Sequence, residues 1–222
     1  MMRMHASPFT LLLLSVALMA GCASRRVMPL DMALFPKTRP APDTRTPGRV
    51  AVLLQPAARD LMHESDEGLA RAMRVAIGSI VASAMLTSAG EAFSDGAERI
   101  EALAGDDTRY TATLVVQSVR LSYHQRLLWF IPLPYLMIWL GDTEFAVHLA
   151  LDVTVLDPQG RVVWTRNYDD GHQIWPHDWT EQGKALDGLQ RVTHEAAWRQ
   201  SQQAMRDLRE WAEGERMRPR SL

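Results

Sequence analysis

The clearest pattern of hydrophobic and polar positions lies in the second half of the chain. Residues 145–156 alternate strictly, with every second side chain apolar, as expected for a strand that buries one face. The segment Asp157-Pro158-Gln159-Gly160 has the residues of a tight turn, and residues 161–168 then return as a partner strand. These segments predict an antiparallel hairpin. Residues 186–211 carry apolar side chains at helical spacing and predict a long amphipathic helix.

The first half of the chain gives shorter signals. Residues 49–54 form an apolar run that predicts a buried strand, and residues 110–123 are rich in Thr, Val and Leu and predict another. Residues 65–90 have acids near their start and apolar residues at helical spacing, which predicts a helix. A second, shorter helix is expected over residues 91–103. This order of elements predicts an α+β fold, in which helices pack on one face of a small, mostly antiparallel sheet.

A different apolar run, residues 10–20, lies near the N-terminus behind a short segment that carries Arg3 and His5. It is too short to be a permanent membrane span and has the layout of an export signal. The run ends in an apolar residue, two small residues and a cysteine: Met19, Ala20, Gly21 and Cys22. This ending resembles the lipobox of bacterial lipoproteins.

The lipobox resemblance implies that residues 1–21 are removed and that the Cys22 thiol takes up lipid. In that family the cysteine carries several acyl chains, which together give lasting membrane attachment. Ala23 stands where inner-membrane retention uses aspartate, so the resemblance implies the outer membrane, facing the periplasm. Cys22 is the only cysteine, so no intrachain disulfide is expected. An ordinary cleaved signal with an incidental cysteine remains the alternative.

The segment after the signal, residues 22–48, contains five prolines and several basic residues. Proline removes backbone donors and favours extended chain, so this segment predicts a tether. It is either a solvated spacer or a contact for anionic head groups. The folded domain is expected at residues 49–213, followed by a basic tail at residues 214–222.

Two short motifs carry a second resemblance. The run at residues 50–53 (Val-Ala-Val-Leu) opens the domain, and residues 160–164 (Gly-Arg-Val-Val-Trp) close the hairpin. With the element order, they resemble a group of periplasmic lipoproteins that includes the curli-secretion lipoprotein, the activators of penicillin-binding proteins and the lipoprotein of Pel polysaccharide export. The resemblance implies a non-enzymatic helper of envelope assembly or export, often oligomeric.

An apolar insert, residues 127–140, separates two predicted strands and carries no charge, although connections between strands are normally polar and exposed. Three interpretations remain open. The insert either folds back over the core or forms a third sheet edge that covers the long helix, or it forms a subunit or partner interface, or it dips into the membrane that holds Cys22. The last two would use Trp129, Phe130, Tyr135 and Trp139.

The net charge and the candidate metal ligands reduce the number of function classes that remain. The formal net charge of -2 provides no basic field for nucleic acid. The loop after the hairpin holds His172, His177 and Asp178, which are weak metal-ligand candidates without a recognisable spacing. No catalytic motif or cofactor is predicted. We therefore expect a lipid-anchored, non-catalytic envelope lipoprotein that binds an envelope partner or self-assembles. The alternatives are a lipid- or amphiphile-binding protein that uses the insert, and a metal-dependent hydrolase.

Overall fold

A computed structural model describes residues 26–36, 45–65, 73–103, 108–132, 139–174 and 182–217. The predicted signal, Cys22 and the end of the basic tail lie outside these residues. The elements are β1 (Arg26–Met28), η1 (Met32–Leu34), β2 (Val50–Leu54), α2 (Pro56–Arg59), β3 (His63–Glu64), β4 (Met73–Val75), α3 (Ile77–Ala92), β5 (Ala97–Arg99), β6 (Ala112–Pro132), β7 (Trp139–Leu156), β8 (Val162–Ile174) and α4 (Gln182–Met217).

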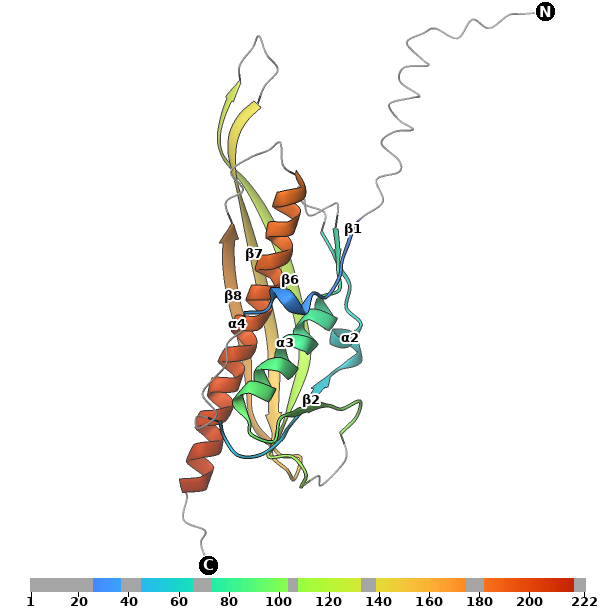
Figure 1. The fold of residues 1–222 in the computed structure, drawn as a ribbon, viewed down its shortest axis with the longest axis vertical. Helices are drawn as coiled ribbons and strands as arrows, with labels where there is room; N and C mark the ends of the chain where they lie inside the picture. Colours follow the sequence, from blue (N-terminus) through green and yellow to red (C-terminus); the bar gives the residue numbers. More distant parts are fainter. Residues whose placement is uncertain are drawn as a thin grey trace, which may run out of the picture.

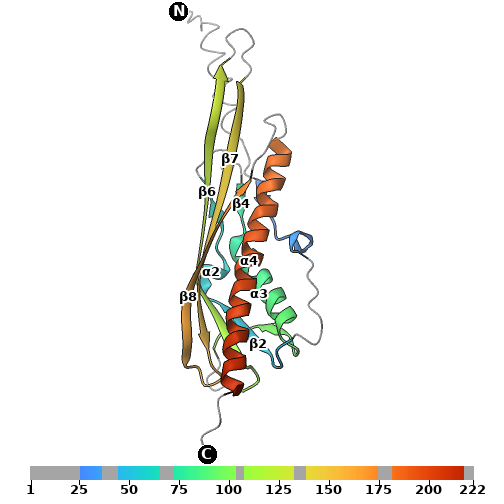
Figure 2. The ribbon, with the colours of Figure 1, turned by 90° about the vertical axis from the view of Figure 1, so that its left-hand side faces the viewer.

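The main sheet has five strands in the order β5-β2-β6-β7-β8, and a small sheet has the order β1-β4-β3. Helices α3 and α4 lie on the same face of the main sheet, where they also contact one another (Figure 2). The core lies between them and this face. The alternating apolar row of β7 points inward, and Val147, Leu149, Leu151 and Val153 are fully buried.

The α+β class, the antiparallel hairpin and the long C-terminal helix are confirmed. Strands β7 and β8 pair antiparallel, and the turn between them is closed by a 2.9 Å hydrogen bond from the N–H of Gly160 to the carbonyl of Asp157. Gly160 has φ +75°, a conformation that glycine adopts without steric cost. Helix α4 extends beyond both ends of the predicted range.

The prediction of a mostly antiparallel sheet is wrong, because the main sheet is mixed. Strand β2 pairs parallel with β5 and with β6, while β6, β7 and β8 pair antiparallel. A parallel pair needs a long connection between its strands, and the chain between β2 and β6 contains α3. An apolar run identifies a buried strand but carries no information on the direction of its neighbours.

Two helix predictions also need correction. The helix expected over residues 65–90 begins only at Ile77, and Met73–Val75 forms β4 instead. The short helix expected over residues 91–103 is absent from the described part of that range, where β5 is formed. Phe93 ends α3, and Gly96 has φ +79°, which a continuing helix does not allow. Strands of three residues are too short to show an alternating pattern. The apolar spacing of these segments was therefore interpreted as helical.

Candidate functional site

Strands β6 and β7 form a long hairpin that extends beyond the rest of the fold (Figures 1 and 2). Their pairing continues to Pro132 and Trp139, whereas β8 pairs with β7 only as far as Phe145 opposite Ile174. We call the two-stranded part, residues 126–132 and 139–144, the arm. At about 3.3 Å per residue, each of its strands projects roughly 20 Å.

The arm contains all of the described part of the apolar insert. The register places Arg126 opposite Glu144 at its base, Trp129 opposite Asp142, and Phe130 opposite Gly141. Trp139 lies opposite Pro132 at its far end, and Tyr135 lies outside the described residues. The first interpretation included a loop folded back over the core, and this is wrong for the described backbone, which continues two strands away from the core. A sheet edge that covers the long helix stays a prediction.

Residues 26–35, which we call the strap, lie within the predicted tether but pack on the fold. Strand β1 pairs parallel with β4, and Met28 and Phe35 are only 2% and 4% exposed. The Phe35 ring stacks on Trp198 of α4, with the ring centroids 5.8 Å apart. The structured part of the chain thus begins well before residue 49, because the strap buries apolar side chains that the proline-rich composition conceals.

A buried histidine connects the strap to α4. His194 Nε2 accepts a 3.1 Å hydrogen bond from the N–H of Asp31, and Nδ1 lies 2.8 Å from the carbonyl oxygen of Gln190. Nδ1 therefore carries the proton and the ring is neutral. Burial lowers the pKa of His194, against the opposing effects of the Gln190 carbonyl and the Asp31 charge.

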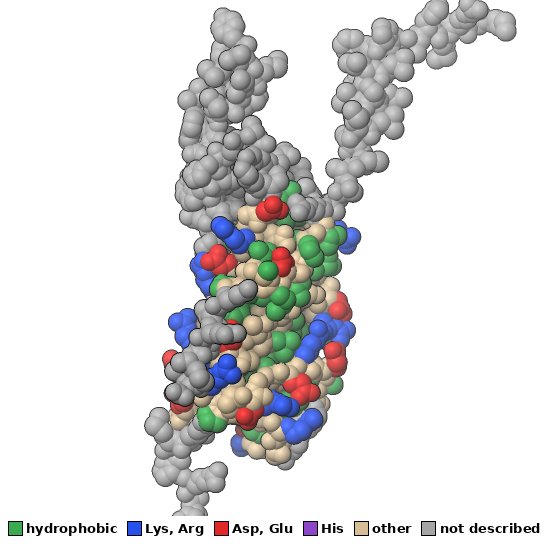
Figure 3. Space-filling model, in the orientation of Figure 1, with side chains coloured by type: hydrophobic (Ala, Val, Ile, Leu, Met, Phe, Trp, Pro, Cys, Tyr) green, Lys and Arg blue, Asp and Glu red, His purple; other side chains and the backbone are tan. Residues whose placement is uncertain are grey.

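Figure 3 shows the face that carries α3, on which hydrophobic side chains gather and most charged side chains lie toward the rim.

Sequence reasoning missed the strap contacts. Their signals were Phe35, a large apolar residue between prolines, and His194, which the helical pattern places on the apolar face of α4.

The strap and the arm lie at the same end of the fold. β1 is drawn at the end from which the arm leaves (Figure 1). The small sheet that β1 joins also contains β3, whose His63 ring lies 5.6 Å from the ring of Tyr123, three residues before the arm begins. Cys22 precedes β1 by four residues, a span of at most about 14 Å.

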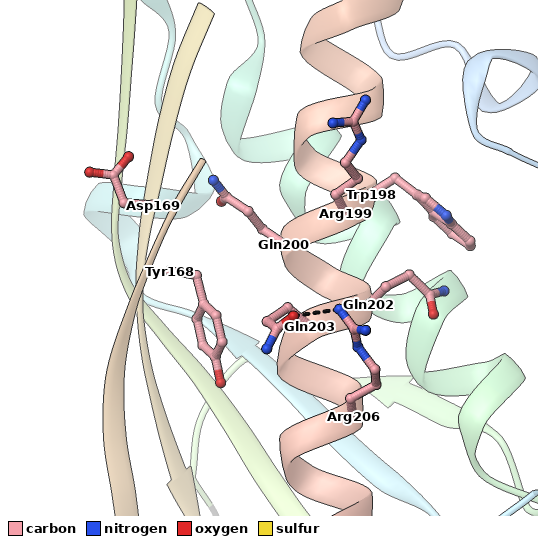
Figure 4. Close-up of a pocket in the computed structure, with 8 residues that line it drawn as sticks. All are labelled: Tyr168, Asp169, Trp198, Arg199, Gln200, Gln202, Gln203 and Arg206. Carbon is pink, nitrogen blue, oxygen red and sulfur yellow. Dashed lines mark hydrogen bonds between the residues drawn. The ribbon is translucent and has the colours of Figure 1, made fainter. Parts of the chain in front are cut away.

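A groove of about 570 Å³ lies between β8 and α4 (Figure 4). Tyr168 extends from β8 toward α4, and its hydroxyl donates a 2.8 Å hydrogen bond to Asp207. Burial and this carboxylate raise the pKa of the Tyr168 hydroxyl. Arg166 also pairs with Asp207, at 2.5 Å. The residues lining the groove are Tyr168, Asp169, Trp198, Arg199, Gln200, Gln202, Gln203 and Arg206.

The residues that would serve a metal-dependent hydrolase are not brought together where the structure describes them. His172 lies in β8 opposite Val147, while His177 and Asp178 lie outside the described residues. Within the described ranges, no group of three His, Cys, Asp or Glu side chains is placed to hold a metal ion. In the same part of the chain, no helix is both long and apolar enough to span a membrane.

Comparison with known proteins yields neither a matching family model nor a matching curated protein. Solved structures similar to this chain include three bacterial lipoproteins. An uncharacterized lipoprotein B from Nitrosomonas europaea is 12% identical, with a TM-score of 0.46 over 80% of this chain and 92% of that one. The rare lipoprotein B from Shewanella oneidensis is 11% identical, with a TM-score of 0.39 over 75% and 99%. A minor lipoprotein from Acinetobacter baumannii is 15% identical, with a TM-score of 0.35 over 73% and 92%.

None of these three names the curli-secretion, penicillin-binding-protein-activator or Pel-export groups, so that narrower resemblance stays a prediction.

Proposed function

We propose that this protein is a lipid-anchored, non-catalytic lipoprotein of the outer membrane, and that its arm binds a protein partner at that membrane from the periplasmic side. One observation carries the proposal: the arm leaves the fold at the end where β1 begins the strap (Figure 1), and Cys22 precedes β1 by only four residues in the sequence. A chain held by lipid at this end presents its arm to the membrane or to proteins in it.

The backbone of the arm favours a protein over hydrocarbon as its surroundings. The arm lies past the Phe145–Ile174 pair and has only two strands. Each of them has one edge without a pairing strand among the described residues. In hydrocarbon, every unpaired N–H and C=O costs several kcal/mol, so open sheet edges do not occur there. In water, an isolated two-stranded hairpin is marginal at best. A partner protein supplies both strand pairing and an apolar surface.

The uncharged sequence of the insert supports the same proposal. Fourteen consecutive residues without charge, residues 127–140, are poorly suited to permanent exposure, and aromatic residues are enriched where protein interfaces are buried. Interfaces of this kind gain most of their binding free energy from a few large side chains. We assign that role to Trp129, Phe130 and Trp139, with Tyr135 beside them in the sequence.

The test replaces Trp129, Phe130 and Trp139 together by serine in the full chain, produced in a bacterium. The detergent-solubilised protein should then run as a smaller particle than the parent, while its thermal unfolding midpoint stays within about 2 °C. The matched control is Leu103→Ser, which removes an apolar side chain that is 52% exposed and lies outside both the arm and β8; it should leave the particle size unchanged. A triple variant that unfolds, or one whose particle keeps the parental mass, would refute the proposal.

A further inference from the structure

Strand β8 is an edge of the main sheet. Among the described strands it pairs only with β7, over almost its whole length from Val162 to Ile174. Thr165 and Asn167 are exposed along it. Unpaired backbone groups along an edge are a template for another strand, and Val162 at the start of β8 is a large apolar residue left in solvent. This edge is long enough to hold an extended segment of another chain.

The groove between β8 and α4 adjoins this edge and contains an unsatisfied acceptor. Gln200 is 3% exposed, and its side-chain nitrogen donates to the carbonyl of Leu149 on β7. Its Oε1 is buried and has no hydrogen-bond partner. Figure 4 shows the Gln200 side chain extending from α4 toward the sheet, into the space beside Tyr168. A buried acceptor without a donor destabilises the fold, and a donor entering the groove would relieve this cost.

The charges on the α4 side of the groove are positive. Arg206 is exposed and bonds Gln203, and no carboxylate among the described residues is paired with it. Arg199 forms an exposed ion pair with Glu195 at 3.1 Å. The acid on the β8 side, Asp169, points away from α4 (Figure 4). A ligand in the groove therefore meets two guanidinium groups two helical turns apart on one helix face.

We propose that this groove binds an extended, acidic segment of a partner protein, which adds to β8 as a further strand. Backbone hydrogen bonds to the β8 edge provide affinity, and alternate side chains enter the groove. Acidic side chains of the segment pair with Arg199 and Arg206, and one of its N–H groups reaches Gln200 Oε1. This site goes beyond the proposed function, since it requires neither the lipid on Cys22 nor the arm.

The probe is a fluorescent peptide as long as β8 that alternates valine and glutamate, titrated against the full chain in detergent and followed by anisotropy. We expect saturable binding that weakens by about tenfold or more in Arg206→Glu. The matched control, Arg191→Glu, reverses an exposed charge on α4 outside the groove and should leave the dissociation constant unchanged. A peptide N-methylated at alternate residues keeps its charges but loses strand pairing, so it should not bind.

Three results would overturn this inference: no binding of the peptide, equal binding to the parent and Arg206→Glu, or equal binding of the N-methylated peptide. If phosphatidylglycerol vesicles bind through Arg206 while the peptide does not, the groove is a site for anionic lipid and strand addition is wrong. The triple serine variant of the arm should bind the peptide as the parent does, so failure of the arm proposal and failure of this one can be distinguished.

Discussion

The strap begins at the end of the fold from which the arm leaves (Figure 1), but the two segments differ in their contacts with the rest of the fold. The strap buries Met28 and Phe35 and is bonded to α4 through His194. The arm lies beyond the Phe145–Ile174 pair, where the pairing of β7 with β8 ends. In the described backbone, the two strands of the arm pair only with each other. The strap therefore contributes to the stability of the fold, whereas the contacts of the arm would come from the proposed partner.

This difference bears on the orientation that the domain would take at a membrane if Cys22 carries lipid. A long flexible tether would let the domain take any orientation at a membrane. Here the ordered strap begins four residues after Cys22, so a lipid on that cysteine would be held close to the base of the arm. The orientation of the arm relative to the membrane would then depend on the contacts of the strap. Variants of the strap therefore test the role of the arm, and variants of the arm test the role of the strap.

The largest expected effect on stability comes from the strap. Phe35→Ala removes a ring that is 4% exposed and stacked on Trp198, and truncating a buried phenylalanine costs about 3 kcal/mol or more. Urea denaturation should show this loss in the free energy of unfolding. The matched substitution in the arm, Phe130→Ala, should cost less than about 0.5 kcal/mol. Equal losses in the two variants would break the distinction between strap and arm.

A smaller effect is expected from pH, through His194. Its pKa is lowered in the folded protein, so below pH 6.5, the ordinary pKa of histidine, the unfolded chain binds more protons than the folded one. The stability that neutral His194 contributes is therefore fully present above pH 6.5. It is lost as the pH falls from 6.5 toward the lowered pKa of His194 in the folded protein. Protonation also removes the acceptor at Nε2 that holds the N–H of Asp31, so the strap contact weakens in the same range.

The variant His194→Gln separates this contribution from others. Glutamine can donate and accept hydrogen bonds but does not titrate, so unfolding free energies measured between pH 7.5 and 5.5, a range chosen around the histidine pKa of about 6.5, should fall less in the variant. Burial also lowers the pKa of His63, and the slope common to both proteins includes that residue. Parallel pH profiles for parent and variant would remove His194 from the account.

The smallest effect on stability is expected from Thr143→Pro in the arm. Thr143 lies opposite Leu127, and proline there removes a backbone donor and disturbs the pairing of the two strands. The unfolding free energy should change little, while the mass of the detergent-solubilised particle should drop as in the triple serine variant. Thr143→Ala keeps the donor and should behave as the parent does. A full-size particle from the proline variant would show that strand pairing in the arm is not needed for assembly.

Sequence reasoning succeeded where one face of an element is buried along its whole length. The alternation along β7 and the helical spacing in α4 each repeat often enough to show a period. It failed where long-range contacts decide the structure. Strands β4 and β5 have three residues each, and the parallel pairing of β2 depends on the path of the intervening chain.

The candidate sites divide in the same way. The uncharged insert was visible because connections between strands are rarely apolar, but the continuation of β6 and β7 through it depends on their pairing, which composition does not show. The strap was not recognised because it lies within the proline-rich segment of residues 22–48. The groove beside β8 brings together Tyr168 and Arg206, which are distant in sequence and meet only because α4 packs against the strand.

The most direct test of the central claim places a photo-crosslinking amino acid at position 129 in the arm and, separately, at position 103, in cells that produce the full chain. Leu103 is 52% exposed and lies outside both the arm and β8. We predict a protein adduct of defined mass from position 129, found in the membrane fraction and lost when Cys22 is replaced by serine, with no such adduct from position 103. Adducts from position 129 that contain only lipid, or a protein adduct that persists without Cys22, would contradict it.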